Sequence, residues 1–472
     1  MNRIVAVSNR VTVPKRAAAA GGLAVGVLAA MKSRGGLWFG WSGETSDGAP
    51  GPPVLMERQS VTYATIDLPT ADHEPYYCGF CNGALWPLFH YFVGALHYSD
   101  TQYAAYERVN RLFADRLHPL LRGDDLVWVH DYHLIPLGQE LRQRGVRQPL
   151  GFFLHIPFPH VEALRALPVY GELVRNLLAY DLVGFQTQQD LECFRSAVAE
   201  VVGPSALRDD GSIQYGARRA CADVFPIGVD VEEIQREARH SQGSETVRRM
   251  DAGLLGRRCI IGVDRLDYSK GLVDRFLAYE RFMESHVENL NRVTFLQIAP
   301  LSRADLRTYA EIRHSLEQTA GRINGRFAET DWTPIRYLNR NYSHEVLMGF
   351  LRRADVGVVT PMRDGMNLVA KEFVAAQDPA DPGVLVLSTL AGAARELSSA
   401  LLVNPRDTHA VAEAIQQALA MPLEERRGRH AEMLKVLRRN DIHAWHTRFV
   451  EQLRASADPG LLPLPRRQAS AR

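Results

Sequence analysis

Two segments in the second half of the sequence combine charged side chains with a predicted helix start. The first, GVDRLDYSKGL (262–272), carries Arg265 and Lys270 between an apolar run and a helical stretch. Two cations beside the N–H groups of a helix N-terminus form a favourable phosphate site. The alternative is a surface ion pair between Arg265 and Asp264 or Asp267. The GxxxxGK[ST] pattern does not occur in the sequence, so the segment is not a P-loop.

The second segment, RDGMNLVAKE (363–372), also follows an apolar run. A helix is predicted to begin at Asn367 or Leu368, so its first N–H groups could bind a pyrophosphate. In the next turn, Glu372 could accept hydrogen bonds from a ribose diol, and Asp364 could bind a sugar hydroxyl in the same way. The simpler alternative is that Asp364 or Asn367 only caps the helix and that Glu372 pairs with a neighbouring arginine.

The first half of the sequence contains a cluster of aromatic residues instead. EPYYCGFCNGALWP (74–87) places Tyr77 and Trp86 close together, and Trp41 ends an earlier apolar run. Aromatic faces beside hydrogen-bonding groups suit sugars, because the C–H faces of a sugar stack on the rings while its hydroxyls are bound. The alternative is that these rings belong to a hydrophobic core.

Polar residues also follow other apolar runs, where predicted strands end. HDYHL (130–134) provides Asp131, HIPFP (155–159) provides His155, and Arg303 follows a third run. The neighbouring histidines raise the question of a zinc site, but no HExxH helix supports one. We therefore expect Asp131 and His155 to bind a polar substrate, and we expect no metal ligands.

The composition limits the classes of partner. The 472 residues include 55 basic and 54 acidic side chains, which give a net charge of +1 and no general reason to expect nucleic acid or a membrane surface. The five cysteines form no disulfide framework, and the CxxC spacing of Cys78 and Cys81 is interpreted as coincidental. The apolar stretch at 17–31 is too short to span a membrane. We expect a cytoplasmic protein, and self-association into a homo-oligomer is left open.

Short apolar runs rich in Val, Ile and Phe alternate with helical stretches throughout the chain. The predicted strands are the runs at 4–8, 37–41, 61–66, 126–130, 150–156, 182–186, 259–264, 293–299, 335–338, 355–359, 384–388 and 401–404. This alternation predicts βαβ units with parallel sheets, arranged as two tandem Rossmann-like α/β domains. We expect an N-terminal domain at 1–240, a C-terminal domain at 241–455 whose last helix could pack back on the first domain, and a tail at 456–472. Because open α/β sheets bind ligands at the carboxyl ends of their strands, we expect the active site in the cleft between the domains.

Several longer motifs resemble those of the bacterial trehalose-6-phosphate synthase family. The resemblance covers nearly the whole chain, from SNR (8–10) to about residue 450. The matching motifs are AGGLAVG (20–26), GGLWFGWSGE (35–44), YYCGFCNGALWPLFHY (76–91), VWVHDYHL (127–134), FLHIPFP (153–159), GVDRLDYSKG (262–271), QIAPLSR (297–303) and TPMRDGMNLVAKEFVAAQ (360–377).

This resemblance implies a retaining glycosyltransferase of the GT-B architecture that needs no metal ion or other cofactor. Its expected substrates are UDP-glucose and glucose 6-phosphate, and its expected products are α,α-trehalose 6-phosphate and UDP. The alternatives are a sister transferase with an acceptor such as glycerol 3-phosphate, and a non-catalytic sensor of sugar phosphates. A dinucleotide oxidoreductase is disfavoured because GxGxxG does not occur in the sequence.

The resemblance also assigns residues, motif by motif. Arg265 and Lys270 would hold the donor diphosphate, Glu372 its ribose, and Arg10 and Arg303 the acceptor phosphate. The expected donor-binding set is Gly21, Gly22, Arg265, Lys270, Tyr342, Asp364, Leu368, Val369, Ala370, Lys371 and Glu372. The expected acceptor-binding set is Arg10, Trp41, Tyr77, Trp86, Asp131 and Arg303. The expected catalytic set is Asp131, His155, Arg265, Lys270 and Asp364.

Overall fold

The computed structural model describes residues 3–11, 31, 35–48, 50–58, 60–301 and 307–456. The chain divides into two compact units: unit 1 runs to Pro226 and resumes at Trp445, and unit 2 is Ile227–Ala444. The expected boundary at 240 falls inside helix α9 (Val231–Ser241), so that boundary is corrected to 226. The helix has a polar composition typical of a linker, but one of its faces is buried against α13 (His344–Arg353) of unit 2.

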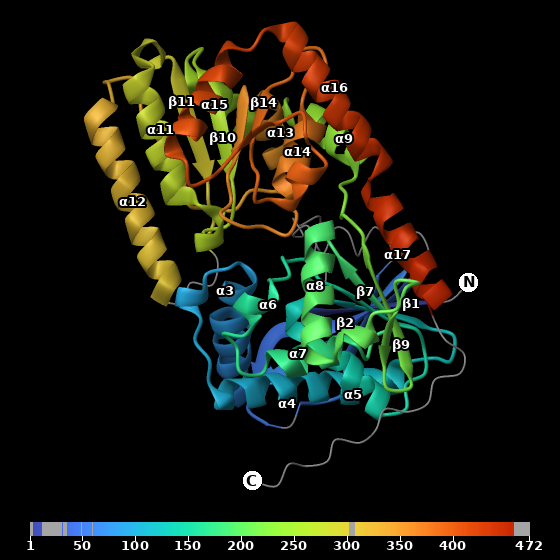
Figure 1. Cartoon of the computed structure of the whole chain (residues 1–472). Coiled ribbons are helices and arrows are strands. Elements are labelled where there is room, and N and C mark those ends of the chain that lie inside the picture. The colour runs from blue at the N-terminus through green and yellow to red at the C-terminus, as the bar shows by residue number, and fades with distance from the viewer. Residues whose placement is uncertain are drawn as a thin grey trace. The chain divides into compact units, whose positions relative to one another are not determined.

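Among the described residues of unit 1, nine strands form a sheet in the order β3-β4-β2-β1-β5-β6-β7-β9-β8 (Figure 1). The outer pairs β3–β4 and β8–β9 are antiparallel and all other pairs are parallel. The carboxyl ends of β1, β5 and β6 therefore lie side by side, with His130 opposite Phe153. The strands are β1 (Ile4–Arg10), β2 (Gly36–Ser46), β3 (Val54–Arg58), β4 (Val61–Pro69), β5 (Leu126–His130), β6 (Leu150–Phe153), β7 (Leu182–Phe185), β8 (Ile213–Tyr215) and β9 (Arg218–Val224).

The aromatic segment of unit 1 forms an unusual π-helix, Glu74–Leu85. It packs against α4 so closely that a Cβ on Gly79 would overlap the side chain of Gln102. The longer helices of unit 1 are α4 (Asp100–Leu117), α5 (Leu137–Gln143), α7 (Tyr170–Leu177) and α8 (Gln188–Val201), and the short ones are α2 (Thr70–His73), α3 (Trp86–Phe89) and α6 (Val161–Leu164).

The last helix, α17 (Ile442–Ser456), covers part of the unit 1 sheet from Trp445 onward. Phe449 stacks on Trp128, and a Cβ on Gly151 or Gly184 would overlap the Phe449 ring. The two glycines of β6 and β7 thus make room for a phenylalanine from the far end of the sequence.

Unit 2 contains a fully parallel sheet. Its described strands follow the order β12-β11-β10-β13-β14-β15. They are β10 (Arg258–Val263), β11 (Val293–Ile298), β12 (Ile335–Leu338), β13 (Val356–Val359), β14 (Val384–Ser388) and β15 (Leu401–Val403). The remaining helices are α10 (Glu245–Leu254), α11 (Leu272–Ser285), α12 (Arg307–Phe327), α13 (His344–Arg353), α14 (Leu368–Ala376), α15 (Thr408–Ala420) and α16 (Leu423–Arg439).

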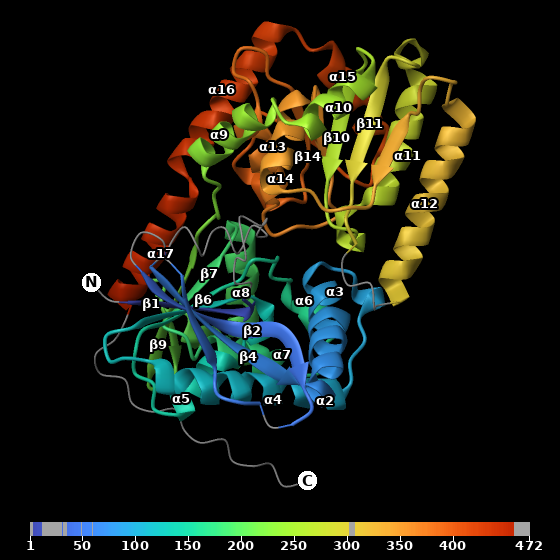
Figure 2. The same ribbon diagram turned by 180° about the vertical axis from the view of Figure 1, so that it is seen from behind.

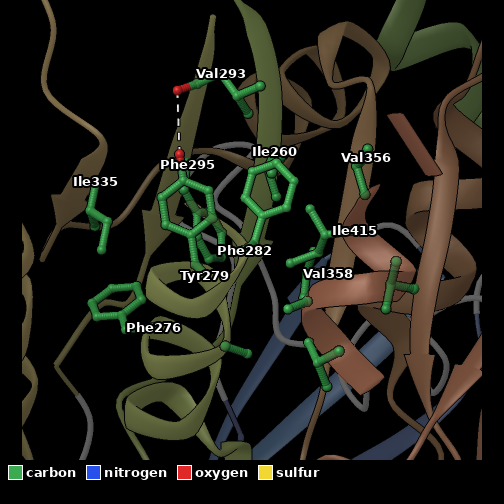
Figure 3. Packing of buried hydrophobic residues seen from close by; sticks show 14 of the residues in the cluster. Ile260, Phe276, Tyr279, Phe282, Val293, Phe295, Ile335, Val356, Val358 and Ile415 are labelled. Atoms are coloured by element: carbon green, nitrogen blue, oxygen red, sulfur yellow. Dashed lines mark hydrogen bonds between the residues drawn. The ribbon is translucent and has the colours of Figure 1, made fainter. Parts of the chain in front are cut away.

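Helices cover both faces of this sheet (Figures 1 and 2). On one face, α11, α12 and α15 pack into a buried cluster with Val356 and Val358. Between these two valines, Gly357 faces the opposite side and contacts Phe373 of α14. Figure 3 shows rings of α11 against the strands, with the Tyr279 hydroxyl donating to the Val293 carbonyl at 3.3 Å. The α/β class with two mainly parallel sheets agrees with the sequence prediction.

Candidate functional site

Two loops of unit 2 meet at the carboxyl ends of the neighbouring strands β10 and β13. The backbone N–H of Met362 donates to the Ser269 carbonyl at 2.7 Å, and Gly271, with a φ of 64°, lies where a Cβ would be 2.7 Å from the Thr360 carbonyl oxygen. Only glycine fits this left-handed and crowded position. The contact brings the predicted segments 262–272 and 363–372 together, although about ninety residues separate them in the sequence.

At this junction Lys270 and Asp364 form an ion pair. Their Nζ and Oδ2 atoms are 2.5 Å apart, and both side chains are largely shielded from solvent. The Asn367 amide donates to the same carboxylate oxygen at 3.0 Å. A cation, a carboxylate and an amide are thus held at the point where α14 begins.

Asn367 also fixes the start of α14. Its backbone is left-handed, with a φ of 75°, and its side-chain oxygen accepts a hydrogen bond from the Ala370 N–H at 3.2 Å. Asn367 thus caps the helix, as the simpler alternative proposed. Its side-chain oxygen binds the Ala370 N–H, which we expected to face the nucleotide. Leu368 and Val369 are the other first-turn residues of the expected donor set. A left-handed backbone at a residue other than glycine is typical of sites under functional constraint.

Lys371 is a member of the expected donor-binding set, and its side chain is held inside unit 2. Its ammonium group is completely buried, 2.5 Å from a Glu396 carboxylate oxygen and 2.7 Å from the carbonyl oxygen of Ile227. Asn440 donates to the other carboxylate oxygen of Glu396 at 2.8 Å. A buried charge is costly unless it is paired and hydrogen-bonded, and this network meets both needs. Lys371 therefore fastens α14 to the chain entering unit 2.

Glu372 lies one residue further along α14 and pairs with a histidine, not with an arginine. His344 Nε2 is 3.6 Å from Glu372 Oε1, and His344 Nδ1 is 2.5 Å from Glu237 Oε2 on α9. Burial lowers the pKa of His344, but hydrogen bonds and charges from the two carboxylates outweigh burial and raise the pKa to about 10. The imidazole is therefore charged at neutral pH. Nearby, Tyr342 packs against Phe350 at 5.2 Å.

Arg265 and Arg275 have different environments on the same side of unit 2. Arg265 is exposed, whereas Arg275 is completely buried and donates to Asp264 at 2.5 Å and to Thr360 at 2.9 Å. Asp267 accepts from the Ser269 hydroxyl and backbone, which orders the turn before Lys270. Sequence reasoning did not select Arg275. Its guanidinium group stabilises both loops, because it is hydrogen-bonded to Asp264 at the start of one and to Thr360 at the start of the other.

In unit 1, Arg10 ends β1 with an exposed guanidinium group. Its Cζ atom lies 5.7 Å from the centre of the Trp41 ring. Gly43 lies against this guanidinium group, and its φ of 100° is one that residues with a side chain rarely adopt. Within the described part of the chain Arg10 has no ion-pair partner, which leaves its charge available for a ligand.

The aromatic residues of unit 1 form a stack beside Arg10. Tyr77 stacks between His73, at 5.9 Å, and His133, at 6.0 Å, and its ring lies 5.8 Å from Trp41. Trp41 and Trp86 are each only 4% exposed. Most of both indole rings therefore belongs to the hydrophobic core, which was the alternative interpretation of these residues. Tyr77 is partly exposed.

Asp131 and His155 follow the neighbouring strands β5 and β6. Asp131 has a left-handed backbone, with a φ of 77°, and its carboxylate accepts the His155 N–H at 3.2 Å. The His155 ring lies 3.1 Å from His130, measured between His155 Nε2 and His130 Nδ1. Burial lowers the pKa of His155 to about 3, so the ring is neutral. The ends of β5 and β6 in unit 1 therefore hold two neighbouring, uncharged imidazole groups.

The sequence matches the model of glycosyltransferase family 20 over residues 5–455. The chain belongs to glycosyltransferase family 20. A trehalose-6-phosphate synthase of Salmonella arizonae is 49% identical over 454 residues, which make up 96% of this chain and 95% of that protein.

Two solved structures also resemble this family 20 chain. An α,α-trehalose-phosphate synthase (UDP-forming) from Burkholderia xenovorans, in complex with glucose-6-phosphate, is 50% identical and superimposes with a TM-score of 0.92, covering 96% of this chain and 100% of that chain. An E. coli structure described as bound with UDP-2-fluoro glucose is 47% identical, with a TM-score of 0.90 and coverage of 96% and 99%.

Three expected ligand residues of the family 20 chain, Gly21, Gly22 and Arg303, lie outside the described residues. In the described ranges, no group of three or more His, Cys, Asp or Glu side chains is arranged to hold a metal ion. The helices described here include none that is both long and apolar enough to cross a membrane.

Sequence reasoning missed three residues in addition to Arg275. Asn367 was considered only as a cap, and neither His130 nor His344 was assigned a role. His130 and His344 act through partners from distant segments, which neither spacing nor composition reveals, whereas the partners of Asn367 lie within its own loop and helix start. The signal that could have drawn attention to His130 is its position at the end of the same apolar run that precedes Asp131.

Proposed function

We propose that this chain transfers glucose from UDP-glucose to glucose 6-phosphate with retention, forming α,α-trehalose 6-phosphate and UDP. The observation that carries the proposal is the Lys270–Asp364 pair at the N-terminus of α14. A cation beside a helix N-terminus suits a departing diphosphate, and a carboxylate suits sugar hydroxyls. The relatives bound with glucose-6-phosphate and with UDP-2-fluoro glucose support the identities of acceptor and donor.

On the donor side, Arg265 and Lys270 hold the diphosphate, together with the backbone of the first turn of α14. Glu372 binds the ribose through its carboxylate, which His344 and Glu237 hold in place. Asp364 and His155 bind the glucose. The other donor residues of the proposal are Gly21 and Gly22 near the phosphates, Leu368 and Val369 by their backbone, and Tyr342 near the base.

On the acceptor side, Arg10 and Arg303 bind the phosphate of glucose 6-phosphate. A doubly charged phosphate suits arginine, because the guanidinium fork donates two parallel hydrogen bonds. Tyr77 and Asp131 contact the sugar ring. Trp41 and Trp86 contribute only the edges of their buried rings.

In the proposed mechanism the acceptor hydroxyl attacks the anomeric carbon from the side on which UDP departs. The bond between that carbon and the diphosphate oxygen breaks, and this oxygen takes the proton of the attacking hydroxyl. Arg265, Lys270 and the α14 N-terminus stabilise the negative charge that develops on the diphosphate. No metal ion is needed for this role.

A product assay tests the proposal. The purified chain is given UDP-, ADP- or GDP-glucose with either glucose 6-phosphate or glycerol 3-phosphate, and the products are identified by mass. We expect a disaccharide phosphate from UDP-glucose and glucose 6-phosphate. A glucosylated glycerol phosphate as the main product would replace the proposal with the sister transferase, and substrate binding without any product would indicate a sensor.

A further inference from the structure

The two imidazole rings of His130 and His155 are joined in a way that the mechanism above does not use. His130 is the last residue of β5 and is completely buried, and His155 follows the neighbouring strand β6. His130 Nδ1 and His155 Nε2 are 3.1 Å apart, within hydrogen-bond distance. One of the two nitrogens must carry the proton between them.

Both rings are uncharged at neutral pH. Burial lowers the pKa of His155 to about 3, and burial together with His155 lowers the pKa of His130 well below its usual value. A neutral imidazole has one N–H and one lone pair. The pair therefore has two possible states: His130 donates from Nδ1, or His155 donates from Nε2.

The second nitrogen of His130 decides between these states. If His155 donated, His130 would carry its own proton on Nε2, and this atom is buried with no hydrogen-bond partner in the described part of the chain. The rings of Trp128 and Trp445 lie 4.6 Å and 6.4 Å from the His130 ring. Their indole nitrogens are also buried and unpartnered within the described ranges, and an indole N–H can only donate.

A proton on His130 Nε2 would therefore add a third buried donor to a region that already has two. Buried N–H groups without a partner are rarer in proteins than under-used acceptors. A bare lone pair on Nε2 is the less costly arrangement. It requires the His130 proton to sit on Nδ1 and to point at His155.

We propose that His130 is a positioning residue: it donates its Nδ1–H to His155 Nε2 and so keeps the remaining proton of His155 on Nδ1. His155 then presents a neutral N–H donor to its ligand. The identity of that ligand, a hydroxyl oxygen of the donor glucose, rests on the proposed function. The proton placement does not, because it follows from groups of unit 1 alone.

Nuclear magnetic resonance of the full-length chain labelled with ¹⁵N-histidine tests the proton placement without any substrate. Two histidines serve as internal standards: His90 Nδ1 lies 2.8 Å from the Trp86 carbonyl oxygen, and His430 Nε2 lies 3.0 Å from the Val374 carbonyl oxygen. Because a carbonyl can only accept, His90 must carry Nδ1–H and His430 must carry Nε2–H. We expect His155 to show the pattern of His90. The pattern of His430 would overturn the proposal, whatever reaction the chain catalyses.

A matched pair of variants tests the consequence for binding. His130→Asn can keep a donor at the position of Nδ1, whereas His130→Leu fills the space without one. We expect His130→Leu to mix the two His155 patterns and raise the donor KM about fivefold with little change in the acceptor KM, as for one lost neutral hydrogen bond. His130→Asn should stay near the parent. Equal impairment in both variants, or an unchanged His155 signal in His130→Leu, would reduce His130 to a packing residue.

Discussion

The candidate residues of the two units differ in how their polar groups are stabilised. In unit 1, His130 and His155 are neutral and lie among aromatic rings. In unit 2 the corresponding groups are charged and paired, as in Lys270–Asp364 and Lys371–Glu396. These two histidines of unit 1 are thus uncharged, whereas the two pairs of unit 2 match opposite charges.

The pKa values of two histidines show how large this difference is. Burial alone lowers the pKa of His155 to about 3, while two carboxylates outweigh burial and raise the pKa of His344 to about 10. The side chain is the same, so the surroundings set its charge. A neutral hydrogen-bonding surface suits the hydroxyls of glucose, and an ionic one suits a nucleoside diphosphate. The contrast therefore supports the proposed roles of His155 on the donor glucose and of Lys270 on the donor diphosphate.

The largest effect should come from breaking the buried pair of unit 2. Glu396→Gln leaves the Lys371 ammonium buried without a counter-charge, so we expect unit 2 to lose about 3–5 kcal/mol of unfolding free energy. Urea unfolding followed by circular dichroism measures this loss. The control is Arg219→Met, which breaks the exposed Arg219–Asp210 pair and should change nothing measurable. Equal loss in both variants would remove the contrast between buried and exposed pairing.

Lys270 should matter for turnover more than for stability. In Lys270→Ala the cation beside the α14 N-terminus is lost, and we expect kcat to fall by about 10²–10³-fold, as for other removed contacts to a developing negative charge. Lys435→Ala is the matched control, because Lys435 is an exposed lysine on α16. Near-normal turnover of Lys270→Ala would end the proposed role of Lys270.

Much of the fold could be predicted from the sequence because buried parallel strands are apolar at nearly every position. The run LVWVH (126–130), for example, is strand β5 to the residue. The strands that escaped prediction are β3, β8 and β9, which carry polar or exposed residues and lie at the sheet edges or next to one. The π-helix Glu74–Leu85 also escaped, because no sequence period marks it.

The candidate site could be predicted where its residues lie on the loops that directly follow strands. The helix start at Asn367 and the convergence of Lys270 with Asp364 follow from residues placed after strands. The partners of the Lys371 side chain, Glu396 and the Ile227 carbonyl, could not be predicted because they come from distant segments. A lysine at the start of a helix has the same sequence signature whether it faces a ligand or the core.

Replacing Arg10 in unit 1 should change the KM of one substrate only. Arg10→Ala removes a charged donor from the proposed acceptor phosphate, and such hydrogen bonds contribute about 1.5–3 kcal/mol, so the KM for glucose 6-phosphate should rise at least about tenfold. The KM for UDP-glucose should change much less. Initial-rate kinetics with each substrate varied in turn measures both values. Equal increases would contradict the assignment of Arg10 to the acceptor.

A further effect should appear in the pH dependence of stability. Because the folded pKa of His344 is raised from 6.5 to about 10, its stabilising effect is complete below pH 6.5 and is lost as the pH rises towards 10. The side chain is 26% exposed and therefore partly screened by solvent, so we expect the pKa shift to contribute only about 2 kcal/mol to the free energy of unfolding. His344→Gln should therefore differ most from the parent below pH 6.5 and converge with it near pH 10.

His155 should show the opposite trend on the acid side. Its folded pKa is lowered to about 3, so the unfolded chain binds a proton first and the parent loses stability as the pH falls from 6.5 towards 3. His155→Gln should lose less stability over that interval. Unfolding curves of the two variants and the parent across the pH range test both trends. If His155→Gln and His344→Gln altered the same pH interval, these two histidines would not differ in the way they are stabilised.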